Sequence, residues 1–131
     1  MNNVADEEFV RAFEACNTPN EGFHHRDHIR LAWIYHRLYG REAAARIAAA
    51  IRKFAAHHGK SDKYHETVTQ AWMRLVAHCS EAETADFESF AARHPELLDK
   101  TLLSEFYSDA LLQSDLARER FAAPDRKPLP D

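Results

Sequence analysis

Residues 42–58, EAAARIAAAIRKFAAHH, carry the clearest helical pattern of the chain. Apolar side chains recur every three or four positions, which is the spacing of one face of an α-helix. The members of this face are Ala44, Ile47, Ala48, Ile51, Phe54 and Ala55. Several of them are small and let a second helix approach closely, and the following Gly59 is a common residue just past a helix end. The stretch predicts a helix within a bundle.

The same periodicity predicts further helices on both sides of this stretch. They are expected at residues 6–16, 25–39, about 64–79 and 86–93, with shorter pieces at 96–98, 102–106 and 114–121. Ser61 or Asp62 is expected to cap the fourth helix and Ser114 the last one, because their side-chain oxygens accept a backbone N–H. Three prolines within residues 122–131 predict an extended tail.

Length and composition agree with a single all-helical domain. The chain has 131 residues, of which 45% are hydrophobic and three are glycine. A chain of this length buries roughly two thirds of its unfolded surface, and the scarcity of glycine argues against a turn-rich β fold. The sequence therefore predicts one all-α domain over residues 1–131. It would be an irregular bundle of four to five main helices with short C-terminal helices.

Charge and hydropathy argue against two classes of partner. The 17 basic and 21 acidic residues give a net charge of −4, and they are interleaved without the basic stripe that nucleic-acid binding needs. No apolar run approaches the roughly 20 residues that span a membrane. The acidic start MNNVADEEF lacks the apolar core of a signal peptide. A cytoplasmic location is expected, with Cys16 and Cys79 as reduced thiols on apolar helix faces.

Histidines on the expected inner faces of two helices are the main functional candidates. His25 and His28 are three positions apart, so their Cβ atoms would lie roughly 5–6 Å from each other. His65 is expected on the inner face of another helix, and packed helices are roughly 8–10 Å apart. Three imidazoles that leave one position open suit a catalytic Zn²⁺ or a non-haem Fe²⁺. The sequence predicts a metal site made by these three side chains.

Four further residues are candidates for chemistry around such a metal. Glu66 would be a fourth ligand, an acceptor for an imidazole N–H of a ligand histidine, or the catalytic acid or base beside a metal-bound water. A regular helix, however, turns it about 100° away from His65. Tyr35, Tyr64 and Arg118 are candidates for binding a small organic substrate; for Arg118 a structural salt bridge is the alternative. The protein would then be a small metal-binding protein, with metal-dependent hydrolase or oxygenase as the expected enzyme class.

A metal-free interpretation of the same residues stands beside this one. Inward histidines also form hydrogen-bonded polar clusters, here with Tyr35, Tyr39 or Thr69 as partners. A His-x-x-His pair alone is a weak signal, because helices carry it by chance. The chain would then be a binding or interaction module whose histidines organise the core. Its apolar content is compatible with a homodimer.

Several segments resemble a family of small, uncharacterised, all-helical bacterial proteins. The matching segments are His25 and His28 with Ile29, Tyr64-His65-Glu66-Thr67-Val68-Thr69, Tyr107-Ser108, Ser114 with Ala117-Arg118, Pro124-Asp125 and Pro128-Leu129-Pro130. The family often has leucine where this chain has Ile29. The resemblance extends from about residue 23 to the C-terminus, and the Tyr-His-Glu-Thr segment is its most specific part. It implies no reaction, but it selects the same histidines and Glu66.

Overall fold

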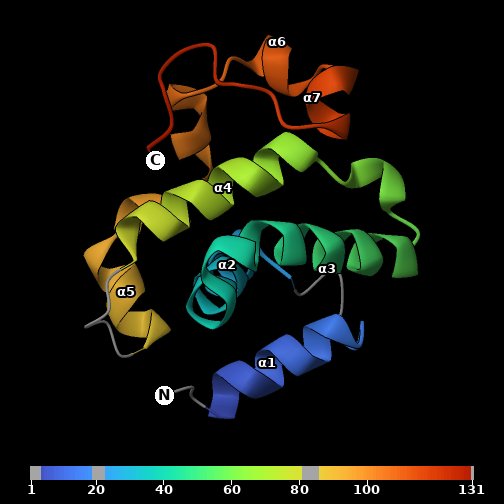
Figure 1. Cartoon of the computed structure of the whole chain (residues 1–131), viewed down its shortest axis with the longest axis vertical. Coiled ribbons are helices and arrows are strands. Elements are labelled where there is room, and N and C mark those ends of the chain that lie inside the picture. The colour runs from blue at the N-terminus through green and yellow to red at the C-terminus, as the bar shows by residue number, and fades with distance from the viewer. Residues whose placement is uncertain (1–3, 19–22, 81–85, 131) are drawn as a thin grey trace.

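A computed structural model describes residues 4–18, 23–80 and 86–130 of the chain (Figure 1). Within these residues the regular secondary structure is helical throughout, which confirms the all-α prediction. Four long helices are α1 (Val4–Glu14), α2 (His25–Tyr39), α3 (Ala43–His57) and α4 (Glu66–Cys79). Shorter helices are α5 (Phe87–Arg93), α6 (Asp109–Leu112) and α7 (Asp115–Glu119). The 3₁₀ segments are Gly40–Glu42, Ser61–Lys63, Pro95–Leu98 and Lys100–Glu105.

Helix α2 lies at the centre of the bundle and packs against α1, α3 and α4. In Figure 1, α1 lies on one side of the α2 and α3 pair, and α4 lies on the other. This position explains why α2 is buried on more than one face: Leu31, Trp33 and Tyr35 are all at most 1% exposed. Phe13 from α1 and Val76 from α4 complete the core around it without any exposure.

The C-terminal segments cover the outer side of α4 and are fixed to it by a buried hydroxyl. Thr67 is fully buried, and its Oγ1 lies 2.6 Å from the carbonyl oxygen of Ala117 and 3.0 Å from that of Arg120. The same oxygen accepts the N–H of Ala122 at 2.9 Å. The tail beyond this point has no helix, as predicted, and its Leu129 returns to the core. One threonine of α4 thus holds the end of α7 and the start of the tail.

The start of α4 differs from its prediction. Ser61 and Asp62 were expected to cap this helix, but they belong to the separate 3₁₀ segment Ser61–Lys63. Tyr64 and His65 follow with extended backbones, and the His65 side chain is the cap, because its Nδ1 accepts the N–H of Val68 at 3.2 Å. The expected cap of the last helix is confirmed, since Ser114 accepts the N–H of Ala117.

Two other expectations can be compared with the fold. Neither Cys16 nor Cys79 forms a disulfide, in agreement with the prediction of reduced thiols. Among the helices of residues 4–18, 23–80 and 86–130, none combines the length and the apolar character needed to cross a membrane.

Candidate functional site

A cavity of about 530 Å³ lies between α2, α3, α4, α6 and the 3₁₀ segment Lys100–Glu105. All three predicted histidines line it, His25 and His28 from α2 and His65 from the start of α4. Cavities of roughly 300–1,000 Å³ are typical of small-molecule sites. The structure therefore brings the predicted histidines to one cavity, from segments 37 or more residues apart in the chain.

The cavity is apolar at its base and polar at its mouth. The lining residues that are buried from solvent are Ala32, Ile47, Met73 and Leu103, while those that are exposed are Lys63, Lys100, Thr101, Ser104 and Asp109. The three histidines are intermediate in exposure and lie between these two groups. A molecule with an apolar body and a polar end would find matching surroundings for both parts.

The His28 imidazole is largely desolvated and directed to this cavity. Burial, followed by the nearby His25, lowers the pKa of His28 to about 4, which leaves the ring neutral at physiological pH. The edge of its ring meets Phe23, with ring centroids 4.5 Å apart. No residue in the described part of the chain makes a hydrogen bond to its nitrogens. A neutral imidazole has one N–H donor and one acceptor, so both are available to a ligand.

The His25 side chain is held by the backbone of Leu97 and by the aromatic ring of Trp72. Its Nε2–H donates to the carbonyl of Leu97 at 2.9 Å, and its ring meets the Trp72 indole edge-on at 4.6 Å. Burial lowers the pKa of His25, and the charge of Lys100 acts in the same direction. The Leu97 contact fixes the tautomer and leaves Nδ1 as the acceptor nitrogen. The His25 ring is thus neutral, has a fixed orientation and lines the cavity.

His65 uses both ring nitrogens for the fold. Its Nδ1 accepts the N–H of Val68, and its Nε2–H donates to the carbonyl of Leu112 at 2.6 Å. The two bonds cap α4 and connect it to the last residue of α6. The prediction placed His65 within a helix, whereas its position before the helix turns the ring toward the C-terminal segments. The side chain still lines the cavity.

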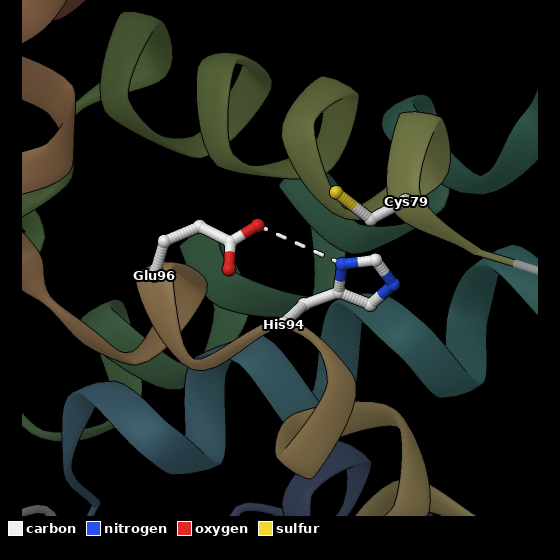
Figure 2. Close-up of side chains that lie close together, drawn as sticks. All are labelled: Cys79, His94 and Glu96. Atoms are coloured by element: carbon white, nitrogen blue, oxygen red, sulfur yellow. Dashed lines mark ion pairs between the residues drawn. The ribbon is translucent and has the colours of Figure 1, made fainter.

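The three histidines do not form a ready metal site in this structure. Within the described residues, the group whose three ligand atoms lie within 4.8 Å of one another is Cys79, His94 and Glu96, in another part of the molecule (Figure 2). His25 and His65 each donate a ring N–H to a carbonyl, so each has one fewer nitrogen for a metal. The three histidines line one cavity, but they are not among the described side chains whose ligand atoms lie within 4.8 Å of one another.

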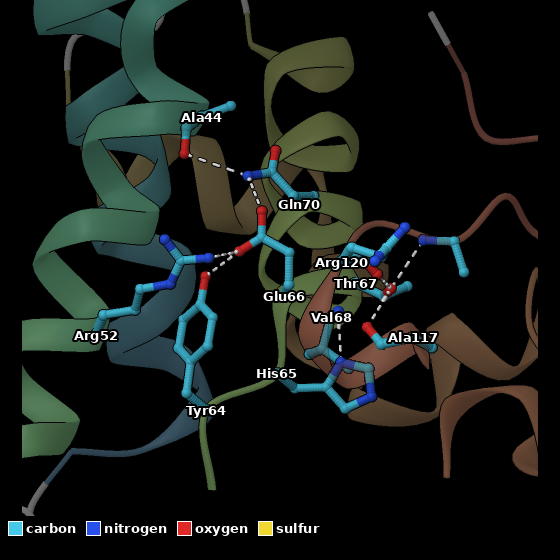
Figure 3. A network of polar contacts seen from close by, with 11 residues as sticks. Ala44, Arg52, Tyr64, His65, Glu66, Thr67, Val68, Gln70, Ala117 and Arg120 are labelled. Atoms are coloured by element: carbon cyan, nitrogen blue, oxygen red, sulfur yellow. Dashed lines mark hydrogen bonds and ion pairs between the residues drawn. The ribbon is translucent and has the colours of Figure 1, made fainter. Parts of the chain in front are cut away.

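Glu66 lies outside the lining of the cavity, in a network that joins α3 to α4 (Figure 3). Its Oε1 accepts the Tyr64 hydroxyl at 2.6 Å and Arg52 at 2.9 Å, and its Oε2 accepts the amide of Gln70 at 3.0 Å. Figure 3 shows this carboxylate and the His65 ring on opposite sides of the start of α4. Glu66, the predicted catalytic residue, does not line the cavity, and its contact with the lining is the hydrogen bond that it accepts from Tyr64.

Tyr64 is the predicted substrate-binding residue that reaches the cavity. Burial raises the pKa of its hydroxyl to about 12, and the bond to Glu66 adds to this, so the phenol stays protonated. Arg52 lies over its ring, 5.0 Å from the centroid. The Tyr64 ring lines the cavity, and its hydroxyl is already hydrogen-bonded to Glu66.

The other two predicted substrate-binding residues lie elsewhere. Tyr35 is 1% exposed and its hydroxyl donates to Glu14 of α1, away from the cavity. Arg118 donates to the backbone carbonyl of Asp62 at 3.2 Å and thereby connects α7 to the 3₁₀ segment before α4. The structural alternative considered for Arg118 agrees with this contact, although the acceptor is a carbonyl and not a carboxylate.

Several lining residues have no recognisable signal in the sequence. Lys63 and Lys100 belong to 3₁₀ segments and Asp109 to the four-residue helix α6, and these elements are too short for a periodicity that indicates which side chains face inward. Trp72 is half-buried and lines the cavity beside His25. If His65 belonged to the helix, as predicted, Trp72 would lie on the same face seven residues later, and this is the one sequence signal for it.

No protein-family model, curated protein or solved structure matches this chain. The family resemblance of residues 64–69 therefore remains a prediction. In the structure, each residue from Tyr64 to Thr67 has a defined contact: a cavity wall, a helix cap, an interhelical network and an anchor for the tail.

Proposed function

We propose that the chain binds a small, partly apolar organic anion in the cavity between α2 and α4. The observation that carries this proposal is the cavity itself, with a neutral, largely desolvated His28 between an apolar base and a mouth that bears two lysines. This corresponds to the metal-free binding module among the functions that the sequence predicts. An aliphatic or aromatic carboxylate has the required chemistry.

Charge at the mouth favours an anion over a neutral or cationic molecule. Lys63 and Lys100 are exposed lining residues, and no described residue forms an ion pair with either of them. Asp109 is the acidic side chain in the lining, so the cations outnumber it. His25 and His28 have lowered pKa values and add no charge at neutral pH. The local balance is positive although the whole chain carries −4.

Binding is favoured over proton-transfer catalysis by the state of His28. A general base works best when its pKa is near the working pH, and that of His28 is about 4. Such a ring accepts a proton weakly at neutral pH but still donates and accepts hydrogen bonds. We assign it the role of orienting a bound molecule.

A second candidate is the Zn²⁺ or Fe²⁺ site of His25, His28 and His65, with Glu66 as acid or base. The observation in its favour is that the three imidazoles line one cavity. For a shared ion, the His65 ring would have to release either Val68 or Leu112, and Glu66 would have to leave Arg52 and Tyr64. This reorganisation makes it the weaker candidate. Metal uptake that is lost on His28→Ala would favour it.

A paired ligand set tests the proposed function. Small aromatic and aliphatic carboxylates, each with its neutral primary amide, are titrated into the protein while the thermal midpoint is followed. We expect carboxylates to raise the midpoint more than their amides. The Lys63→Gln, Lys100→Gln double variant should weaken carboxylate binding about fivefold, since each exposed charge contributes about 0.5 kcal/mol and the two together about 1 kcal/mol.

The matched control is Lys60→Gln, because Lys60 is exposed, neighbours Lys63 in sequence and does not line the cavity. It should bind carboxylates as the unmodified chain does. Equal binding of acids and amides, or equal weakening by Lys60→Gln and the double variant, would contradict the proposal.

A further inference from the structure

Three side chains of metal-binding type converge at the end of the molecule where α4 and α5 finish. Cys79 is the last residue of α4, His94 follows α5, and Glu96 lies in the 3₁₀ segment Pro95–Leu98. One ligand atom from each lies within 4.8 Å of the other two. In Figure 2 the Cys79 sulfur and the Glu96 carboxylate lie on the same side of the His94 ring. None of the three lines the histidine-lined cavity.

The spacing is close to that of a tetrahedral zinc site. With Zn–N and Zn–S bonds of about 2.0 and 2.3 Å, ligand atoms are roughly 3.3–3.8 Å from one another. His94 Nδ1 and Glu96 Oε2 are already 3.6 Å apart. The remaining distances, at most 4.8 Å, require a closure of about 1 Å by side-chain rotation. Glu96 is exposed and can supply this movement without disturbing the core.

The surroundings suit an ion that keeps an open coordination position. Cys79 and Glu96 line a surface hollow of about 360 Å³, together with Glu105 and His78. A water molecule can therefore reach the fourth position of a bound ion. Cys79 and His94 are half-buried, which restricts their motion and favours a defined geometry.

The same geometry argues against a Cys–His–Glu nucleophilic triad. In such a triad the histidine contacts the nucleophile through one ring nitrogen and the carboxylate through the other. Here the carboxylate faces Nδ1, and the sulfur lies on that side of the ring as well (Figure 2). Three ligands around one point are typical of a metal site.

We propose that Cys79, His94 and Glu96 bind one Zn²⁺ ion with water in the fourth position. Thiolate, imidazole and carboxylate are all zinc ligands, and zinc accepts this mixed set in a tetrahedral arrangement. The site joins the end of α4 to the segment after α5, so the ion links two parts of the chain that are 15 residues apart in sequence.

Cobalt titration tests the site, because a Co²⁺–thiolate bond gives a near-ultraviolet charge-transfer band that histidine and carboxylate ligands do not give. The full chain is prepared without a His-tag, treated with a chelator and a reductant, and titrated with Co²⁺ and then Zn²⁺. We expect the band to appear, to saturate at one ion per chain and to disappear when Zn²⁺ displaces Co²⁺. Cys79→Ser should abolish it, and Cys16→Ser should retain it.

Glu96→Gln gives a second readout that does not depend on the cysteine. Glu96 is exposed, so this variant should fold as the unmodified chain does. We expect it to weaken Co²⁺ binding at least about 10-fold, the lower end of what even an outer-shell change costs. His78→Ala, a change in the same hollow, should leave affinity within about twofold.

Three results would overturn the proposal. They are the absence of Co²⁺ uptake, Co²⁺ uptake without a thiolate band, and equal effects of Glu96→Gln and His78→Ala. Uptake without the band would indicate the histidine-lined cavity instead, which contains no cysteine.

Discussion

At the level of single residues, His28 combines a largely desolvated ring with nitrogens that accept no hydrogen bond from, and donate none to, any described residue. His28 is intermediate in exposure, so its ring has lost part of its hydration without gaining a protein hydrogen bond, which lowers stability. Ligand pockets use a few polar groups in apolar surroundings to orient a bound molecule. We therefore expect the His28 side chain to lower the stability of the free protein and to favour ligand binding.

His28→Leu should separate these two effects. We expect the free energy of unfolding at pH 7.5 to rise by about 1 kcal/mol, because an apolar side chain replaces an unpaired polar one. Carboxylate binding should weaken in the same variant. Urea denaturation and ligand titration measure the two quantities. His36→Leu, a change on α2 outside the cavity lining, should alter neither. A His28→Leu protein that is less stable would contradict the interpretation.

The lowered pKa of His28 makes a prediction about acid stability. The ring titrates near pH 6.5 in the unfolded chain and near pH 4 in the folded one, so the unfolded state binds more protons between these values. Stability should therefore fall as the pH is lowered from about 6.5 to about 4. His28 should contribute on the order of 3 kcal/mol to this fall. In His28→Leu this contribution should be missing; parallel pH curves for the two proteins would contradict it.

At the level of elements, the start of α4 shows what periodicity predicts and what it leaves out. The apolar spacing predicts α2 and α3 to within one residue at each end, because Gly40 and Gly59 follow the two apolar patterns where the helices end. For α4 the helix starts five residues after the first candidate cap, Ser61. Serine and aspartate are the usual caps, so the imidazole of His65 was not considered for this role. The sequence alone does not distinguish a histidine that caps a helix from one that points inward from the middle of a helix.

His65 variants test the cap. His65→Ala should lower the free energy of unfolding by about 2 kcal/mol, roughly half from the cap and half from the bond to Leu112. His65→Asn should lose about half as much, since asparagine caps a helix but does not reach α6. His36→Ala should change stability little, because His36 lies in the last turn of α2 and does not cap a helix N-terminus. Equal, small losses in all three variants, measured by chemical denaturation, would contradict the cap.

Thr67 tests how the C-terminal segments are held to α4. Thr67→Val keeps the shape of the side chain but leaves the carbonyls of Ala117 and Arg120 and the N–H of Ala122 without this partner. We expect a loss of about 2–3 kcal/mol and faster hydrogen exchange in α7 and the tail. Thr101→Val, at an exposed threonine, should cost less than about 0.5 kcal/mol. Unchanged exchange in α7 would show that other contacts hold it.

At the level of the whole molecule, the sequence predicts the helical bundle, but not the cavity that the three histidines line. Helices follow from a repeating pattern of apolar residues, which is local. The cavity depends on where the 3₁₀ segment Lys100–Glu105 and α6 are placed, and long-range contacts such as His65 with Leu112 decide this. The contact of Glu66 with Arg52 of α3 is also long-range, so the sequence does not predict that Glu66 points toward α3 and away from His65.

Histidine-ring NMR during a carboxylate titration tests the proposed function most directly. The ¹⁵N resonances of each imidazole are followed while the carboxylate with the largest thermal shift is added. We predict a saturable change at His28, with the dissociation constant found by thermal denaturation, and no change at His36. A carboxylate that binds while the His28 ring resonances stay constant would contradict the proposal that this cavity is the binding site.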